Sequence, residues 1–217
     1  MSAPSPETPR ADAGAPETSS RRGRPGRPRE EGLDARLVEA ALALIDSGEP
    51  VTAAKLVQLS GVSRAAVYRR WPSLTDLVAT ALDRGRDAHV IPIDGDLRAA
   101  LHDAFLGGYE QRMAGYPEAR MRRRLALGLA DPVLQRAYWD AHVARRRVST
   151  IAVLRAGVEQ GLLRADTDLE ACADLLSGVF YYQLVVRGVS LTDAEALARC
   201  RAAFEVIWRG MSAEAGE

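Results

Sequence analysis

The sequence has few of the residues from which catalytic centres are commonly built. Only three histidines and two cysteines occur among 217 residues. His89, His102 and His142 lie 13 and 40 residues apart, which is not the spacing of metal ligands. A glycine-rich phosphate loop and a nucleophile elbow are also missing. We therefore expect no enzyme, no metal and no cofactor; the alternative from another class is a helical enzyme that binds a small molecule.

Both cysteines, Cys172 and Cys200, are expected to stay reduced. In two antiparallel helices they would lie about 12 Å out of step, at a rise of ~1.5 Å per residue, which is too far for a disulfide. Unpaired thiols are typical of a reducing compartment. The first twenty residues contain no apolar run, so we do not expect a signal peptide. These absences favour a cytoplasmic protein with no membrane partner.

Acidic residues are missing from two stretches near the N-terminal end. None occurs between Glu49 and Asp76, and none among the five arginines of residues 21–29. The whole chain is formally neutral, but residues 21–85 carry 11 basic and 8 acidic side chains, net +3, against 17 and 18 from residue 86 onward. This asymmetry indicates that the N-terminal part binds a polyanion.

Strand-like alternation is also absent, since apolar residues recur at helical spacing instead. We predict an all-α protein with a disordered arm over 1–30, a three-helix helix-turn-helix domain over 31–85, and a larger helical ligand-binding and dimerisation domain over 86–217. Helices of the larger domain are expected near 97–106, 119–129 and 132–160, and after the capping boxes Thr167/Glu170 and Thr192/Glu195.

Residues 51–78 read as two short helices around a glycine turn. Thr52 can cap the first, whose buried stripe is expected to be Ala53, Leu56, Val57 and Leu59, and Ser60-Gly61 breaks it. Ser63 can cap a second, basic helix, which Trp71-Pro72 ends. This is the pattern of a helix-turn-helix, whose second helix enters the major groove of DNA. An ordinary helical hairpin with a solvated basic face is the alternative.

The arginine-rich segment before this unit, RRGRPGRPRE, contains glycine and proline that oppose regular structure. It resembles an AT-hook, whose core is Arg-Gly-Arg-Pro, here Arg22 to Pro25. Such arginines suit a narrow, negatively charged minor groove. We expect a flexible arm that contacts DNA through Arg22, Arg24 and Arg27; a solvated tail is the alternative.

Residues 33–82 resemble the DNA-binding domain of the tetracycline-repressor (TetR) family of bacterial transcriptional regulators. The resemblance rests on the amphipathic opening helix, on Gly61-Val62-Ser63 followed by Ala66-Val67-Tyr68, and on the stretch from Tyr68 to Ser73. It implies a sequence-specific DNA-binding regulator, a repressor that a small molecule releases. The remaining alternatives are a regulator without a ligand and an architectural protein.

The resemblance also implies roles for single residues. Tyr68 and Thr52 would touch phosphates, while Arg64, Ala65 and Arg69 would face the groove. The family usually has His at position 70 and Lys at position 74, where this chain has Arg70 and Leu74, so Arg70 or Lys55 is expected to supply the missing phosphate contact. The predicted DNA-binding set from this domain is Thr52, Lys55, Ser63, Arg64, Ala65, Tyr68, Arg69 and Arg70.

The last two predicted helices are apolar over most of their surface, more than one neighbour can cover. This pattern predicts burial against a second copy, and residues 162–187 are similar to a family subgroup that dimerises through these helices. A two-fold dimer suits a palindromic double-stranded DNA operator. Burial in the core of one chain is the alternative. The predicted interface residues are Leu175, Val179, Tyr182, Phe204, Ile207 and Trp208.

A small-molecule cavity between the middle helices is the least specific prediction. Aromatic residues could line it, with His142 and tyrosines as polar groups, although aromatics at helical spacing also form plain cores. Two arginine triplets, 122–124 and 145–147, could bind an anionic effector; each spans nearly a helical turn, so a solvated surface is expected. The predicted pocket residues are Phe105, Tyr109, Met113, Tyr138, Trp139, His142, Phe180 and Tyr181.

Overall fold

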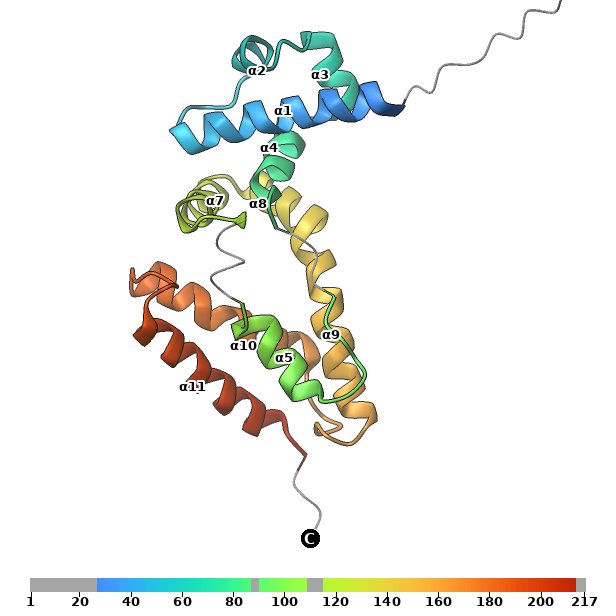
Figure 1. Ribbon diagram of the computed structural model, residues 1–217, viewed down its shortest axis with the longest axis vertical. Helices are drawn as coiled ribbons and strands as arrows, with labels where there is room; N and C mark the ends of the chain where they lie inside the picture. Colours follow the sequence, from blue (N-terminus) through green and yellow to red (C-terminus); the bar gives the residue numbers. More distant parts are fainter. Residues whose placement is uncertain (1–26, 87–89, 109–114, 214–217) are drawn as a thin grey trace, which may run out of the picture.

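The computed structural model describes residues 27–86, 90–108 and 115–213. In these ranges every regular element is a helix, and the only β-type pairing is an isolated bridge between Leu163 and Ser212. The predicted all-α class is therefore confirmed. Figure 1 shows an elongated molecule, with α1 to α4 at one end and α5 to α11 extending away from them.

The first domain contains a long helix and three short ones. They are α1 (Arg27–Ser47), α2 (Ala53–Ser60), α3 (Arg64–Arg70) and α4 (Leu74–Asp83). Fully buried side chains from each of them, Leu37, Leu56, Val67 and Leu77, meet in one core. Helix α1 begins at Arg27, so the predicted disordered arm ends earlier than residue 30, and Arg22 and Arg24 lie outside the described residues.

The second domain has longer helices around a second core. The described elements are α5 (Leu97–Leu106), α7 (Glu118–Ala130), α8 (Pro132–Tyr138), η1 (Trp139–Val143), α9 (Ala144–Glu159), α10 (Leu169–Tyr181), η2 (Tyr182–Val186) and α11 (Ala194–Met211). Helix α8 packs on α4, and its Leu134 and Tyr138 belong to the core of the first domain. The two domains therefore share a packed junction.

Local capping signals position the helix-turn-helix. The side chains of Thr52 and Ser63 accept hydrogen bonds from the backbone N–H groups of Lys55 and Ala66, each at 3.3 Å. Gly61 has a φ of 65°, in the left-handed region that glycine adopts at least cost. The predicted start of the second helix and the turn before it are confirmed.

Four local predictions need correction. We predicted that Thr167 and Thr192 cap the two final helices. The caps are instead Asp168 and Asp193, whose carboxylates accept hydrogen bonds from the backbone N–H groups at the start of each helix. In α2, Val57 is only partly buried and Leu59 is 55% exposed, whereas Ser60 is buried and its hydroxyl donates to the Leu56 carbonyl at 2.6 Å.

Two π-helical turns interrupt the helices that we predicted as regular. The segment η1 lies between α8 and α9, inside the predicted helix of residues 132–160, and η2 continues α10. Such turns insert one extra residue and often mark functional sites. Here η1 packs on α4, and η2 helps to line a cavity at the junction of the two domains.

Candidate nucleic-acid interface and the junction beneath it

Helix α3 presents a basic face to solvent. Its Ala66 and Val67 point into the core, so the helical period leaves Arg64, Ala65, Tyr68 and Arg69 exposed. The Tyr68 ring is 47% exposed, and the Arg64 guanidinium carbon lies 6.0 Å from its centroid. Thr52 and Ser63 are also exposed. This surface combines cationic, hydroxyl and small side chains, which suit contacts with phosphates and base edges.

Arg70 does not belong to this exposed face. Its Nε atom lies 2.9 Å from Oδ1 of Asp34 on α1, and its side chain is only 12% exposed. The expectation that Arg70 replaces the missing lysine contact is therefore not supported, because the cation is held between α3 and α1. Lys55 pairs with Glu49 at 2.8 Å, and both side chains are partly exposed. Exposed pairs contribute little, about 0–1 kcal/mol, so Lys55 can exchange partners.

Asp83, the last residue of α4, lies at the centre of a polar network beneath the DNA-binding domain. Its Oδ1 accepts hydrogen bonds from Tyr138 at 2.9 Å and Arg146 at 2.5 Å, and its Oδ2 lies 3.0 Å from Nδ1 of His142. Burial acts to raise the pKa of Asp83, but the His142 hydrogen bond and the Arg146 charge outweigh it, so its pKa is lowered. Asp83 therefore stays ionised.

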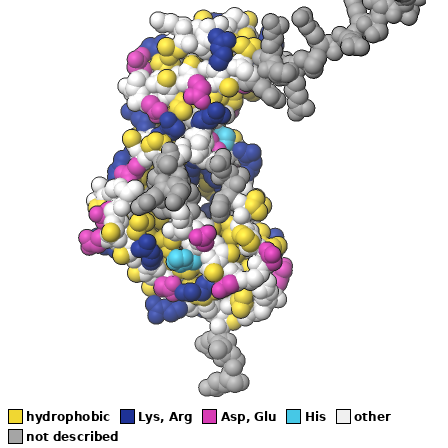
Figure 2. All heavy atoms as spheres, viewed as in Figure 1, with side chains coloured by type: hydrophobic (Ala, Val, Ile, Leu, Met, Phe, Trp, Pro, Cys, Tyr) yellow, Lys and Arg dark blue, Asp and Glu magenta, His cyan; other side chains and the backbone are white. Residues whose placement is uncertain are grey.

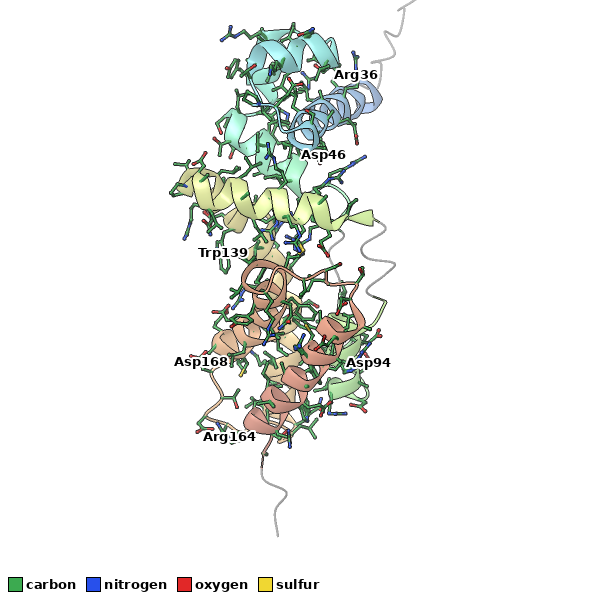
Figure 3. The ribbon with its side chains drawn as sticks, turned by 90° about the vertical axis from the view of Figure 1, so that its left-hand side faces the viewer. Arg36, Asp46, Asp94, Trp139, Arg164 and Asp168 are labelled. Atoms are coloured by element: carbon green, nitrogen blue, oxygen red, sulfur yellow. The ribbon has the colours of Figure 1, made fainter. Side chains whose placement is uncertain are left out.

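Further contacts attach the second domain to α1 and α4. Tyr116 donates a hydrogen bond to the Leu82 carbonyl at 2.8 Å, and burial together with the nearby Tyr138 raises its pKa to about 12. Asp46, labelled on α1 in Figure 3, pairs with Arg120 of α7 at 2.9 Å. Figure 2 shows Lys and Arg side chains gathered around the region where the two domains meet. The junction is held by named polar contacts and by apolar packing.

The arginine triplets largely bind the protein itself and are not simply solvated, contrary to our expectation. Arg122 donates to the backbone carbonyls of Leu184 and Val189 at 2.9 and 3.1 Å. Arg147 pairs with Glu170 and Asp174 at 2.5 and 2.6 Å. Periodicity gives the direction of a side chain but not the partner it meets, so this outcome was not predictable.

A cavity of about 330 Å³ opens at the junction, and only part of the predicted pocket set lines it. Tyr138 and Tyr181 lie on its wall. His142 contacts Asp83 through its Nδ1 atom, and Trp139 is 40% exposed with Arg147 over its ring. Figure 3 labels Trp139 below α7, toward the edge of that view. Trp139 and His142 are therefore not pocket residues.

The other predicted pocket residues lie elsewhere. Phe105 and Phe180 stack with ring centroids 6.4 Å apart, beside a small void with no room for water. Tyr109 and Met113 lie outside the described residues. The prediction missed Arg124, Leu129, Leu134 and Val185, all on the cavity wall. Among these four residues, only Arg124 could have been suspected from the sequence. Three consecutive arginines on a helix point in different directions, so not all of them can face solvent.

The predicted dimer residues separate into two groups. Leu175 and Tyr182 are 57% and 51% exposed, as an interface residue of a free protomer must be. Phe204 is only 2% exposed and belongs to the protomer core, so its assignment was wrong. Val179, Ile207 and Trp208 are partly buried and pack against the same core. Further apolar exposure occurs at Val185, Val186 and Val206.

Two remaining observations concern the C-terminal helices. Residues 169–186 are long and apolar enough, by length and composition alone, to cross a membrane, and 22% of this stretch is buried in the protomer. Helices in the cores of soluble proteins pass the same test. Cys172 and Cys200 are free thiols, and burial raises the pKa of both.

Comparison with known proteins agrees with this architecture. Residues 91–203 match the family model described as tetracyclin repressor-like, C-terminal domain. The HTH-type transcriptional regulator YdeS of Bacillus subtilis is 26% identical over 180 residues, covering 78% of this chain and 86% of the relative.

Solved structures give the same result. The TetR family transcription regulator SCO0332 aligns with a TM-score of 0.57 at 27% identity, over 80% of this chain and 97% of the other. A TetR transcriptional regulator from Agrobacterium tumefaciens aligns with a TM-score of 0.60 at 20% identity, over 84% and 95% of the two chains, which supports the fold alone.

Proposed function

Because this chain belongs to the TetR family, as its match over residues 91–203 establishes, it is a DNA-binding transcriptional regulator, and we propose that α3 is its recognition helix. The observation that carries the proposal is the face of α3 opposite the buried Ala66 and Val67, on which Arg64, Ala65, Tyr68 and Arg69 are exposed to solvent. We propose no catalytic activity for this protein.

Each residue of this face has a chemically suitable role. We assign Arg64 and Ala65, near the start of α3, to base edges, since a guanidinium pairs with guanine and a methyl group contacts thymine. Tyr68, Thr52 and Ser63 carry hydroxyls that can donate to phosphate oxygens. Arg69 and Lys55 add phosphate contacts, because neither is buried. Arg22 and Arg24 remain a proposed minor-groove arm, and we propose that Arg27, the first residue of α1, contacts the same groove.

A homodimer would present two recognition helices to a palindromic operator. The apolar residues that α10, η2 and α11 leave exposed, Leu175, Tyr182, Val186 and Val206, support this assembly. A symmetric interface buries one such patch against its own copy. Burial in a dimer also accounts for an apolar helix that is mostly uncovered in the protomer, without a membrane. The half-sites would then lie about 34–36 Å apart, or a multiple of one DNA turn.

A small-molecule effector is proposed to act at the junction cavity and to release the operator. The cavity shares its wall with α4 through Leu82, and Tyr138 on the same wall binds Asp83. A ligand that prefers one arrangement of these helices would shift the DNA affinity by its differential binding. We place the protein in the cytoplasm, where its operator DNA and a reducing milieu for its two thiols are found.

Selection of bound duplexes from random DNA tests this function. The account expects a palindrome bound by a dimer or by a pair of dimers. A bound population without two-fold symmetry, or without any preferred sequence, would contradict the proposed operator. Thermal-shift measurements with nucleotides and metals provide the test of the alternative, an enzyme.

A further inference from the structure

The junction cavity has one feature that an ordinary apolar pocket lacks, a buried arginine. Its wall is mostly aliphatic, with Leu125, Leu129 and Leu134 on one side and Val185 and Val186 on the other. Arg124 of α7 lies in the same wall and is only 8% exposed. A cation at this depth is costly unless a negative group accompanies it.

No carboxylate of the described residues pairs with Arg124. Its Nη2 atom makes one long contact, 3.4 Å, with the Tyr181 hydroxyl, and its buried Nε atom has no hydrogen-bond partner. The guanidinium carbon lies 4.9 Å from the Tyr138 ring centroid and 6.0 Å from that of Tyr181. The rings hold the guanidinium in place, but they do not neutralise its charge.

Among the described residues, positive side chains outnumber negative ones around Tyr138. Arg86, Arg124 and Arg146 converge on Tyr138, through hydrogen bonds from Arg86 and Arg146 and through the ring contact of Arg124. Asp83 is the acidic residue that the described part of the chain places here, and it already contacts Arg146, His142 and the Tyr138 hydroxyl. A further anion would therefore lower the electrostatic energy of this region.

We infer that the junction cavity binds an amphipathic organic acid, whose carboxylate pairs with Arg124 and whose apolar body lies against the leucines and valines of the wall. A guanidinium matches a carboxylate with two parallel hydrogen bonds. The apolar wall disfavours strongly hydrated inorganic anions and nucleotides, which carry several charges. A volume of about 330 Å³ fits a small ligand, at the lower end of the range for such sites.

This inference rests on the proposed effector site and gives its ligand a chemical class. The acid would sit between α7 and α10, next to the Tyr138 ring, which bonds to Asp83 at the end of α4. Binding would therefore change the environment of the contact that joins the two domains.

The test uses two acids with matched neutral alcohols, 4-phenylbutyrate with 4-phenylbutan-1-ol and decanoate with decan-1-ol. Binding to the full-length protein is measured by calorimetry at pH 7.5, where both acids are ionised. At least one acid should bind at least about tenfold more tightly than its alcohol, because the charge-assisted pair is lost in the alcohol. Equal affinities within both pairs, or no binding by either acid, would overturn the inference.

Variants locate the charge. Arg124→Gln should abolish the preference for the acid while the alcohol still binds, and Arg124→Lys should keep part of it. Arg123→Gln removes the same charge from the adjacent residue, which does not line the cavity, and should keep the full preference. If Arg124→Gln fails to fold, the Lys variant and the comparison of acid with alcohol still decide. A preference that survives in a folded Arg124→Gln protein would contradict the site.

Operator affinity is measured separately, with and without the acid. An acid that binds through Arg124 but leaves DNA affinity unchanged would support the ligand class and contradict the effector role. If the unliganded wild type shows no sequence-specific DNA binding, the proposed function is contradicted, while the inference about the chemical class of the ligand still stands.

Discussion

Tyr138 donates its phenolic hydrogen to Asp83 across 2.9 Å, and this bond joins the last residue of α8 to the last residue of α4. The two residues are 55 positions apart in sequence, and each ends a helix that packs on the other. The orientation of the DNA-binding domain on the second domain is therefore set partly by one buried carboxylate and its donors.

Replacing Asp83 with Asn should destabilise the protein markedly. Arg146 and His142 would lose their ionised partner in a largely buried site, and breaking such a pair from one side costs about 3–5 kcal/mol. For a protein of this size that corresponds to a fall in Tm of roughly 6–20 °C. Glu205→Gln breaks the exposed pair with Arg98 and should cost about 0–1 kcal/mol. Similar melting curves for the two variants would contradict a structural role for Asp83.

Acid should remove the same stabilisation. The pKa of Asp83 is lowered below its ordinary value of 3.8 in the folded protein, so its contribution is complete above that value and is lost as pH falls through the lower folded pKa. His142, Arg146 and Tyr138 are the groups that face it. Urea unfolding of the wild type and of Asp83→Asn between pH 6 and pH 2 should therefore show a stability difference that is constant above pH 3.8 and narrows as the pH falls further. A constant difference across this range would contradict the assignment.

The proposed dimer predicts that one charge on α10 separates the protomers. Leu175→Glu introduces a carboxylate on the apolar surface that two copies would share, and a buried unpaired charge is strongly unfavourable. Sedimentation equilibrium should show a dissociation constant raised by at least about a hundredfold. Val148→Glu makes the same change at an exposed position of α9 and should leave the dimer intact. A Leu175→Glu protein that stays dimeric would place the interface elsewhere.

The arginine arm should contribute affinity without sequence preference. Changing Arg21, Arg22 and Arg24 to Ser removes six positive charges per dimer outside α1. If all six contact phosphates, the slope of log affinity against log salt becomes shallower by up to about 5 units. Specific and random duplexes should weaken alike, because the minor groove mainly distinguishes A·T from G·C. An unchanged salt slope would show that the arm is a solvated tail.

Local features of this fold could be predicted from the sequence, and long-range ones could not. Thr52, Gly61 and Ser63 act on backbone groups within three or four residues, so their roles follow from propensity and capping. The Ser73 cap of α4 was also predictable, since its hydroxyl accepts a hydrogen bond from the backbone N–H of Asp76, three residues on, and donates one to the Asp76 carboxylate.

The partners of Arg70 and Arg124 depend on helices that lie far away in the chain. The helical period shows only that these side chains face a different way from their neighbours, not that Asp34 or a cavity stands there. The same reason explains why Phe204 was assigned to the interface: apolar residues cover both sides of α11, and packing against α5 decides which side is the core.

The central claim, that α3 reads the operator, is tested most directly by the affinity of an Arg64→Ala, Tyr68→Ala double variant for the selected palindrome. Both side chains are exposed, so the melting temperature should stay within about 2 °C, since surface changes usually cost under 0.5 kcal/mol. Fluorescence anisotropy should show affinity reduced by at least about a hundredfold, because base and phosphate contacts are lost together. Arg98→Ala, in the second domain, should bind as the wild type does. Wild-type affinity in the folded double variant would contradict the assignment of α3.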